Sequence, residues 1–227
     1  MKLEISAYSH VGGKSENQDR YMIFYDDQQI KQEPIHKTIT SDEVAMVLCD
    51  GISAFKNASK ASEQCLDTIY QLGSNRFDEW VERSNYEVAK LNSGCTLVGA
   101  KITNGLFEFV NVGDSLIYYI RNNQIYQLAQ LHTLAYSKQL QKIEYIDEQD
   151  HHTLVCYIGN KKTNFKGYRN KVKLQKNDRI IICSDGLSEV LNEEALLVNK
   201  DSAIDLIRTV KNKTSDNVTV IVVEVLE

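Results

Sequence analysis

Five aspartates stand where apolar stretches of this chain begin or end, and four of them are followed by a residue that favours turns. They are Asp19 in ENQDRY, Asp50 in LCDGIS, Asp114 in VGDSLI, Asp185 in CSDGLS and Asp216 in TSDNVT. One Asp-Gly or Gly-Asp pair is ordinary turn chemistry, because aspartate hydrogen-bonds to its own turn and glycine accepts a positive φ. Each position alone therefore favours a structural role, and VGDS is the most turn-like.

The five aspartates taken together predict a metal site. A carboxylate next to a buried strand is held by rigid backbone, and several that face one another gather negative charge that cations must neutralise. Oxygen ligands without thiolates suit Mg²⁺ or Mn²⁺, and the glycine after Asp50 lets the Gly51 carbonyl approach a metal. Two such ions about 3.5–4 Å apart can activate a water and hold the oxygens of a phosphoryl group. No Ser-His-Asp or Cys-His pair with recognisable spacing supports a covalent route.

The elements that would position these aspartates are mostly strands. Alternating or continuous apolar patterns predict strands at residues 2–9, 19–25, 43–50, 95–103, 106–113, 115–122, 124–131, 179–185 and 217–226. The run at 43–50 is nearly all apolar, which predicts a strand buried on both faces. The polar stretch from 26 to 42 is interpreted as one long hairpin connection.

Helical patterns separate these groups of strands. One helix is expected from Asn57, its N-cap, to Gly73, and a second over 76–92 with Trp80 in the core. Two more are expected at 188–199 and 201–213. Clustered strands and paired helices favour antiparallel sheets covered by helices over a doubly wound parallel sheet.

Composition limits the function classes. The chain has 227 residues, one proline and no Pro/Gly/Ser-rich linker, so we expect one domain over 1–227, with an irregular excursion at about 130–168. A formal charge of −5 argues against nucleic acid and anionic membranes as partners, and no stretch reaches the roughly 18 apolar residues of a membrane span. The beginning of the chain lacks the apolar core of a signal peptide, so we expect a cytoplasmic protein.

The five cysteines form no CxxC pair and most lie in apolar runs. We interpret them as reduced core residues of a cytosolic protein: Cys49, Cys65, Cys95, Cys156 and Cys183.

Six short segments occur in order along most of the chain. They are KSENQD at 14–19, LCDGISAFKNASKAS at 48–62, GCT at 94–96, NVGDS at 111–115, SDGL at 184–187 and DNVT at 216–219. Each is weak alone, but together they resemble the metal-dependent Ser/Thr protein phosphatases of type 2C. HHTLVCYIG at 151–159 is similar to the family segment that runs into Ala-Ile-Gly. The resemblance implies an α+β fold, an α-β-β-α sandwich of two antiparallel sheets flanked by helix pairs, which agrees with the pattern above.

The resemblance also implies a role for each aspartate. Asp50 would bridge two Mg²⁺ or Mn²⁺ ions, with the Gly51 carbonyl on one of them and Asp185 and Asp216 on the other. Asp19 would orient metal-bound water, and Asp114 with Asp185 would help form a third, looser site seen in bacterial members. A bridging hydroxide would then attack the phosphorus of a phosphoserine or phosphothreonine. The partners implied are Ser/Thr-phosphorylated proteins and a cognate Ser/Thr kinase.

The chain departs from the family pattern in three places. Lys14 replaces the phosphate-binding arginine, which keeps the charge but loses the planar fork that grips two oxygens. ISAF replaces Gly-Gly-His after Asp50-Gly51, which removes the histidine often proposed as general acid, and Gln18 replaces a glutamate. His132 stands near the position of an Asp-His in the family and is a candidate flap residue or acid. His151 and His152, in the excursion where the family carries a mobile flap, are interpreted as solvated polar chain.

These departures leave more than one hypothesis for the function. The leading one is a phosphoprotein phosphatase, because none of the expected metal-ligating aspartates is missing. The alternative is a pseudophosphatase that binds phosphoproteins with little or no turnover, which Lys14, Gln18 and the lost Gly-Gly-His favour. A metal-stabilised sandwich with some other hydrolytic activity is a more distant third.

Overall fold

The strands form two antiparallel sheets that face each other. We describe a computed structural model of the chain, covering residues 1–73, 76–161, 165–198 and 202–227. Within these residues the first sheet has the order β4-β1-β12-β11-β8-β9 and the second β10-β7-β6-β5-β2-β3. The first sheet contains β1 (Lys2–His10), β4 (Ile35–Thr40), β8 (Leu116–Arg121), β9 (Gln124–Gln127), β11 (Arg179–Cys183) and β12 (Val218–Val225). The second contains β2 (Arg20–Tyr25), β3 (Gln28–Lys31), β5 (Glu43–Cys49), β6 (Leu97–Thr103), β7 (Leu106–Val112) and β10 (Tyr168–Lys173).

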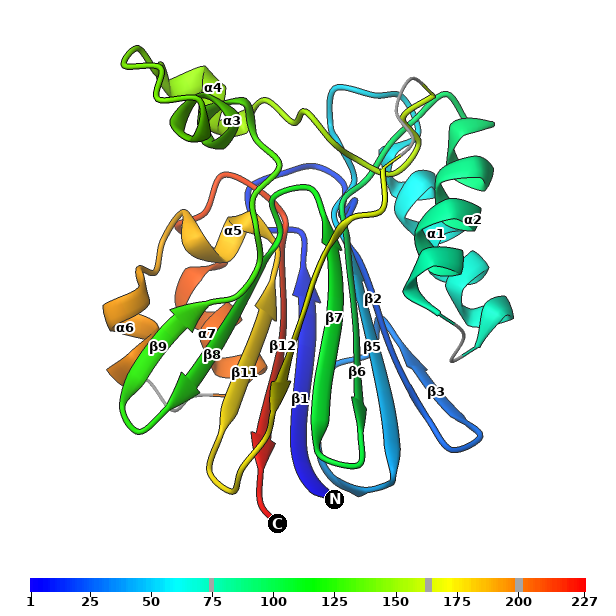
Figure 1. Ribbon diagram of the computed structural model, residues 1–227, viewed down its shortest axis with the longest axis vertical. Coiled ribbons are helices and arrows are strands. Elements are labelled where there is room, and N and C mark those ends of the chain that lie inside the picture. The colour runs from blue at the N-terminus through cyan, green and yellow to red at the C-terminus, as the bar shows by residue number, and fades with distance from the viewer. Residues whose placement is uncertain (74–75, 162–164, 199–201) are drawn as a thin grey trace.

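Helices cover the outer face of each sheet (Figure 1). The second sheet is covered by α1 (Ala58–Leu72) and α2 (Phe77–Ala89), and the first by α5 (Asp185–Ser188), α6 (Glu193–Val198) and α7 (Ala203–Val210). Two short helices, α3 (Leu134–Leu140) and α4 (Glu148–His152), lie beyond the strand ends (Figure 1). This arrangement confirms the predicted sandwich of two antiparallel sheets flanked by helices.

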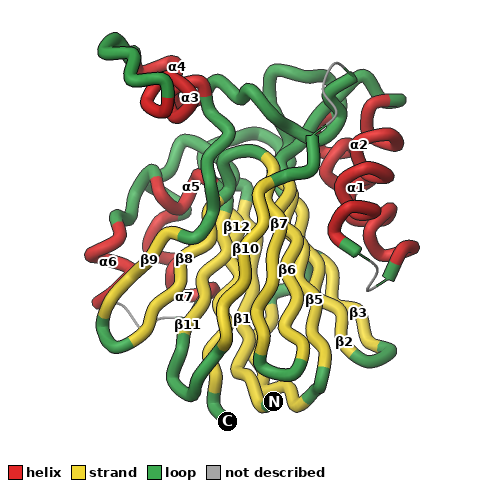
Figure 2. The backbone as a smooth tube through the Cα atoms, in the orientation of Figure 1, coloured by secondary structure: helices red, strands yellow, loops and turns green. Residues whose placement is uncertain are grey.

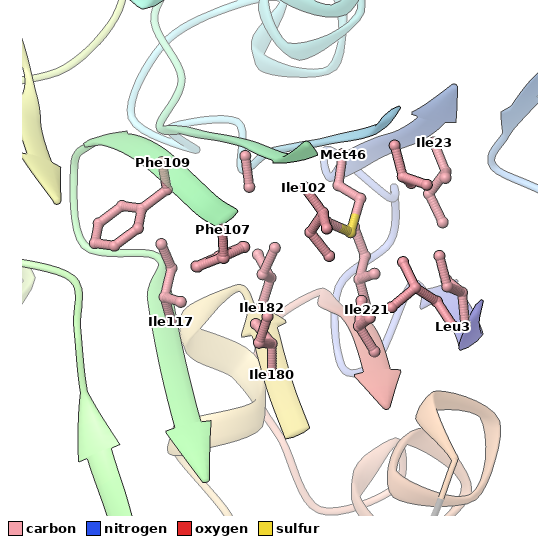
Figure 3. Close-up of a cluster of buried hydrophobic side chains, with 14 of the residues drawn as sticks. Leu3, Ile23, Met46, Ile102, Phe107, Phe109, Ile117, Ile180, Ile182 and Ile221 are labelled. Carbon is pink, nitrogen blue, oxygen red and sulfur yellow. The ribbon is translucent and has the colours of Figure 1, made fainter. Parts of the chain in front are cut away.

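The main core fills the space between the sheets. Side chains from both inner faces meet there, including Met46 and Phe107 from the second sheet and Ile182 and Ile221 from the first (Figure 3). Two further apolar clusters fill the spaces between each sheet and its helices, and Trp80 lies fully buried in the one under α1 and α2. Within the described chain, none of the helices has the length and apolarity to cross a membrane.

The loops that carry the five aspartates gather at one end of the sandwich. They lie at the strand ends far from both chain termini, below α3 and α4 (Figure 2). The first and last strands pair side by side, from Leu3 opposite Val225 to His10 opposite Val218. That register brings the segment after β1 next to the segment before β12, so Lys14 and Asp216 meet.

Two segments are more ordered than the sequence predicts. The stretch from 26 to 42, predicted as one hairpin connection, contains β3 and β4, each at the edge of a sheet. The excursion contains α3 and α4, and β10 begins in its last residues and pairs with β7; its residues 162–164 lie outside the described chain. These edge strands are short, polar and largely exposed, so they lack the apolar alternation that identifies a strand. Asn57 does precede α1, but its side chain makes no capping hydrogen bond.

A buried carboxylate away from the aspartate cluster supports the first sheet. Asp178 is fully buried and accepts hydrogen bonds from Arg121 Nη2 at 2.6 Å, Tyr119 Oη at 3.0 Å and the Gln175 backbone N–H at 2.7 Å. Burial alone would raise its pKa, but these bonds, led by that from Arg121, outweigh burial and hold the pKa of Asp178 below its ordinary value.

We expect Asp178→Asn to lower the free energy of unfolding by about 3 kcal/mol, because it leaves the Arg121 charge without its buried partner. The depressed pKa makes this contribution complete above the unfolded-state pKa of about 3.9 and lost as pH falls through the lower folded-state value. Wild-type stability should therefore decline more steeply on the acid side than that of the variant. Urea unfolding from pH 3 to 7 measures this, with Asp27→Asn in an exposed turn as the control. Parallel profiles for all three proteins would contradict it.

Candidate metal centre

Asp50 is the first residue after β5, and its backbone is fixed on both sides. Its N–H donates to Thr96 Oγ1 at 3.0 Å, and its carbonyl accepts from the Thr96 N–H at 2.7 Å. Thr96 Oγ1 also lies 2.8 Å from Ser115 Oγ. At Gly51 a side chain is excluded, because a Cβ there would lie 2.7 Å from the Ala58 carbonyl oxygen. The Asp-Gly pair of the sequence thus serves a close approach between the β5 end and α1.

Asp185 and Asp216 are brought together by contact between their backbones. Asp185 opens α5, and Asp216 precedes β12. Gly186 packs directly on the residue after Asp216, since a Cβ on Gly186 would lie 2.0 Å from the Asn217 carbonyl oxygen. The second Asp-Gly pair therefore has the same physical cause as the first: glycine is required where two backbone segments touch.

Asp19 lies beneath this cluster, fully buried. One carboxyl oxygen, Oδ2, accepts hydrogen bonds from Ser184 Oγ and Thr219 Oγ1, both at 2.8 Å. The other oxygen, Oδ1, is buried and has no hydrogen-bond partner among the described residues. Asp185 Oδ1 is a second buried oxygen without a partner there. Buried polar atoms are nearly always satisfied, so two unpartnered carboxylate oxygens at one site indicate a ligand that is a cation.

The loop after β1 is held against Asp216 by Asn217. The Asn217 amide donates to the Val11 and Glu16 carbonyls at 2.8 and 2.9 Å, and its oxygen accepts from the Gln18 N–H at 2.8 Å. On this loop Lys14 Nζ lies 3.0 Å from Asp216 Oδ2, with its side chain about one-third exposed. The lysine therefore balances one carboxylate and leaves the others uncompensated.

Electrostatics confirm that the cluster is short of positive charge. Burial, followed by repulsion from Asp19, Asp185, Asp114 and Asp216, holds the pKa of Asp50 well above its ordinary value. Burial and neighbouring aspartates do the same to the pKa of Asp185. Burial raises the pKa of Asp19 and that of Asp114 to about 6 each. An all-oxygen donor set of this charge fits hard divalent cations such as Mg²⁺ and Mn²⁺.

A pocket of about 220 Å³ opens onto the cluster. Six of the predicted site residues line it: Lys14, Asp50, Gly51, Asp114, Asp185 and Asp216. Asp19 lies below the pocket and contributes none of its surface, although its carboxyl group interacts with that of Asp50. The structure therefore brings together every aspartate that the sequence singled out.

The two histidine interpretations have different outcomes. His132 does not line the pocket; its Nδ1 lies 3.2 Å from the N–H nitrogen and carbonyl oxygen of Gly113, and burial lowers its pKa. His152, interpreted as solvated chain, is exposed but lines the pocket at the end of α4, where it partly opposes the effect of burial that raises the pKa of Asp114. Sequence patterns gave no sign of this, because His152 reaches the site only through the path of the excursion.

Comparisons with known proteins agree with this geometry. A family model described as protein phosphatase 2C matches residues 8–219. The serine/threonine phosphatase stp of Listeria welshimeri is 26% identical over 212 residues, covering 79% of this chain and 83% of that protein. The fold is similar to that of the serine/threonine phosphatase Stp1 from Staphylococcus aureus, with a TM-score of 0.81, 22% identity and coverage of 99% and 96% of the two chains. It is also similar to the PstP catalytic domain in complex with two manganese ions, with a TM-score of 0.75, 20% identity and coverage of 100% and 99%.

The fold and the carboxylate cluster define a metal-dependent phosphatase. The family model spans most of the chain, and the protein belongs to the protein phosphatase 2C family. The comparisons thus support a protein phosphatase and not the binding module without turnover.

Proposed function

We propose that this chain removes phosphate from phosphoserine and phosphothreonine in proteins, with two divalent metal ions held by its aspartates. The observation that carries this proposal is the convergence of Asp50, Asp185 and Asp216 on one pocket that Lys14 neutralises only in part. Bound there, such ions supply the charge that binds the phosphoryl oxygens and lowers the pKa of a water. A module that only binds phosphoproteins would not need so many buried like charges, because their repulsion destabilises the folded protein until a cation binds.

Each residue has a distinct task in this proposal. The ions would be held by Asp50 and the Gly51 carbonyl and by Asp185 and Asp216. Asp19, which lies beneath these ligands, would orient the water bound to the ions. The rigid backbone around Asp50 fixes the direction of the carboxylate before any ligand binds, which lowers the cost of organising the site. Asp114, on the pocket wall next to Asp185, would serve a third ion.

A direct assay tests the proposal. Phosphate release from phosphoserine, phosphothreonine and phosphotyrosine peptides is measured with Mn²⁺, with Mg²⁺ and with EDTA. We expect turnover of the first two peptides with either metal, loss in EDTA and recovery when Mn²⁺ is restored. Tight binding of phosphopeptides with Mn²⁺ but without release would identify a binding module, and activity that survives EDTA would remove the role of the ions.

Lys14 is proposed to receive the substrate phosphate. Its ammonium group lies at the pocket, 3.4 Å from Ser53 Oγ as well as next to Asp216, and can turn from the carboxylate to an incoming anion. We expect Lys14→Ala to raise the KM for a phosphopeptide by about 10-fold, the value of one charge-assisted hydrogen bond. Lys14→Arg should restore affinity, because its fork bonds two phosphate oxygens. Steady-state kinetics measure both, with the exposed Lys56→Ala as control; an unchanged KM in Lys14→Ala would refute the assignment.

The finer parts of this function are also proposals. Residues 1–227 would act as one catalytic domain, with residues of about 130–168 as a flap beside the pocket. The enzyme would work in the cytoplasm against a cognate Ser/Thr kinase, and Mg²⁺ or Mn²⁺ would occupy the site. Support for the flap comes from His152 and Leu154, which line the pocket from this segment.

A further inference from the structure

Three cysteines that are far apart in the sequence meet inside the protein. Cys49 ends β5, Cys65 lies in the middle of α1, and Cys95 lies just before β6. Their sulfur atoms all lie within 4.8 Å of one another, and all three residues are fully buried. Their positions in the sequence predict only reduced core residues, since none of them forms a CxxC pair.

The surroundings of this thiol cluster are almost entirely apolar. It lies in the hydrophobic cluster between the second sheet and its helices, in the company of Val47 and Leu66. Two polar groups of the described residues act on it: the Ser84 hydroxyl of α2 interacts with the Cys65 thiol, and Asp50 acts on that of Cys95. Ser84 is fully buried, and its oxygen makes no conventional hydrogen bond with the described residues. Three thiols and one hydroxyl thus lie together in an apolar part of the core, where sulfur supplies the only cluster of metal-ligating atoms among the described residues.

The geometry suits a metal ion with sulfur ligands. A tetrahedral ion with Zn–S bonds of 2.3 Å requires sulfur atoms about 3.8 Å apart, so sulfur atoms that lie within 4.8 Å of one another would have to approach by at most about 1 Å. Thiolates select Zn²⁺ or Cu⁺ and disfavour Mg²⁺ and Mn²⁺, whereas the carboxylate cluster has the opposite preference. The two sites therefore differ in ligand chemistry although they lie close together in the fold.

We propose that Cys49, Cys65 and Cys95 bind one thiophilic ion, Zn²⁺ or Cu⁺, and that each thiol loses its proton to solvent water as its sulfur bonds to the metal, before the cluster closes. The ion cross-links three elements: the end of β5, α1 and the segment before β6. Two of its ligands adjoin the carboxylate site, because Cys49 precedes Asp50 and Cys95 pairs with Gly51 across an isolated bridge. An ion in the thiol cluster holds the backbone of Asp50 in place from behind. Since the cluster is sealed from solvent, the ion enters while the chain folds or through opening of α1.

The test is refolding of the full chain with defined metals under reducing, anaerobic conditions. Refolding with Co²⁺ as a spectroscopic probe should give a thiolate-to-cobalt charge-transfer band in the near ultraviolet. The band should persist in Asp216→Asn, which weakens the carboxylate site, and in Cys156→Ala, a half-buried cysteine outside the cluster. It should disappear in Cys65→Ala. A wild-type protein without the band, or a Cys65→Ala protein that keeps it, would overturn the proposal.

A second measurement needs no variant. Wild-type protein refolded with one equivalent of Zn²⁺ or of Cu⁺, in excess Mg²⁺, is dialysed and weighed by native mass spectrometry. Retention of one Zn²⁺ or one Cu⁺ per chain supports the site and identifies its metal, and the loaded protein should melt at a higher temperature than the metal-free one. Loss of both ions on dialysis would overturn the proposal, whatever the phosphatase assays give.

Discussion

Asp50→Asn is expected to reduce phosphatase activity by about a thousandfold while making the metal-free protein more stable. This carboxylate lies among several others and is the one proposed to bridge the two ions, so its loss should remove that shared ligand. The same loss relieves repulsion in a cluster whose burial and like charges hold the pKa of Asp50 well above its ordinary value. We expect the metal-free variant to gain on the order of 1–3 kcal/mol in free energy of unfolding.

The pair of measurements is sharper than either one alone. Activity is followed with a phosphopeptide and Mn²⁺, and stability by urea unfolding in EDTA, with Asp27→Asn as the control for a surface aspartate. If Asp50 were needed only for the turn, the variant protein would be less stable than the wild type and would keep its phosphatase activity. That outcome would show that Asp50 serves only the turn, as the Asp-Gly pair alone indicates.

Gly186→Ala is expected to have the second largest effect, although glycine has no functional group. A methyl group there would lie 2.0 Å from the Asn217 carbonyl oxygen, well inside any permitted contact. The backbone must therefore separate, which moves Asp185 away from Asp216. We expect a loss of more than about 3 kcal/mol in unfolding free energy and about a hundredfold in kcat, since ligand misplacement near 1 Å has that scale of effect.

Gly73→Ala provides the matched control. Gly73 follows α1 at a φ of +63°, and apart from its chain neighbours no atom of the described residues lies within 4 Å of a new methyl group, so alanine meets mainly local backbone strain. It should cost roughly 1–2 kcal/mol of stability and leave kcat unchanged. A Gly186→Ala protein with normal kcat would show that the contact between these two backbone segments does not position the ligands.

Most of the fold could be predicted because its strands carry strong apolar patterns. The buried run Glu43–Cys49 and the final strand Val218–Val225 were both expected, as was Trp80 in the core. The edge strands β3 and β4 were not, since their residues are half polar and their pairing is decided by the neighbouring strand. Residue patterns predict a strand that is buried on both faces of a sheet much better than they predict a strand that pairs at the edge of a sheet.

The candidate site was predictable to the extent that its residues carry local signatures. Asp50 and Asp185 stand out because each is followed by a glycine that close backbone contact requires. His152 carries no such signature, since an irregular segment decides where it lies. The thiol cluster was hidden for a related reason: Cys65 meets Cys49 and Cys95 only when α1 packs on the second sheet.

The pairing of the first strand with the last has a consequence for how the enzyme is made. Ribosomes release the chain from the amino end, and Asp216 emerges almost 200 residues after Asp19, with which it shares the site. A nascent chain can form β1 and β2 early, but it holds an incomplete set of acidic groups until β12 leaves the exit tunnel and inserts between β1 and β11. Because Asp216 is proposed to hold a metal ion, we expect a chain that lacks β12 and the segment before it to have no phosphatase activity.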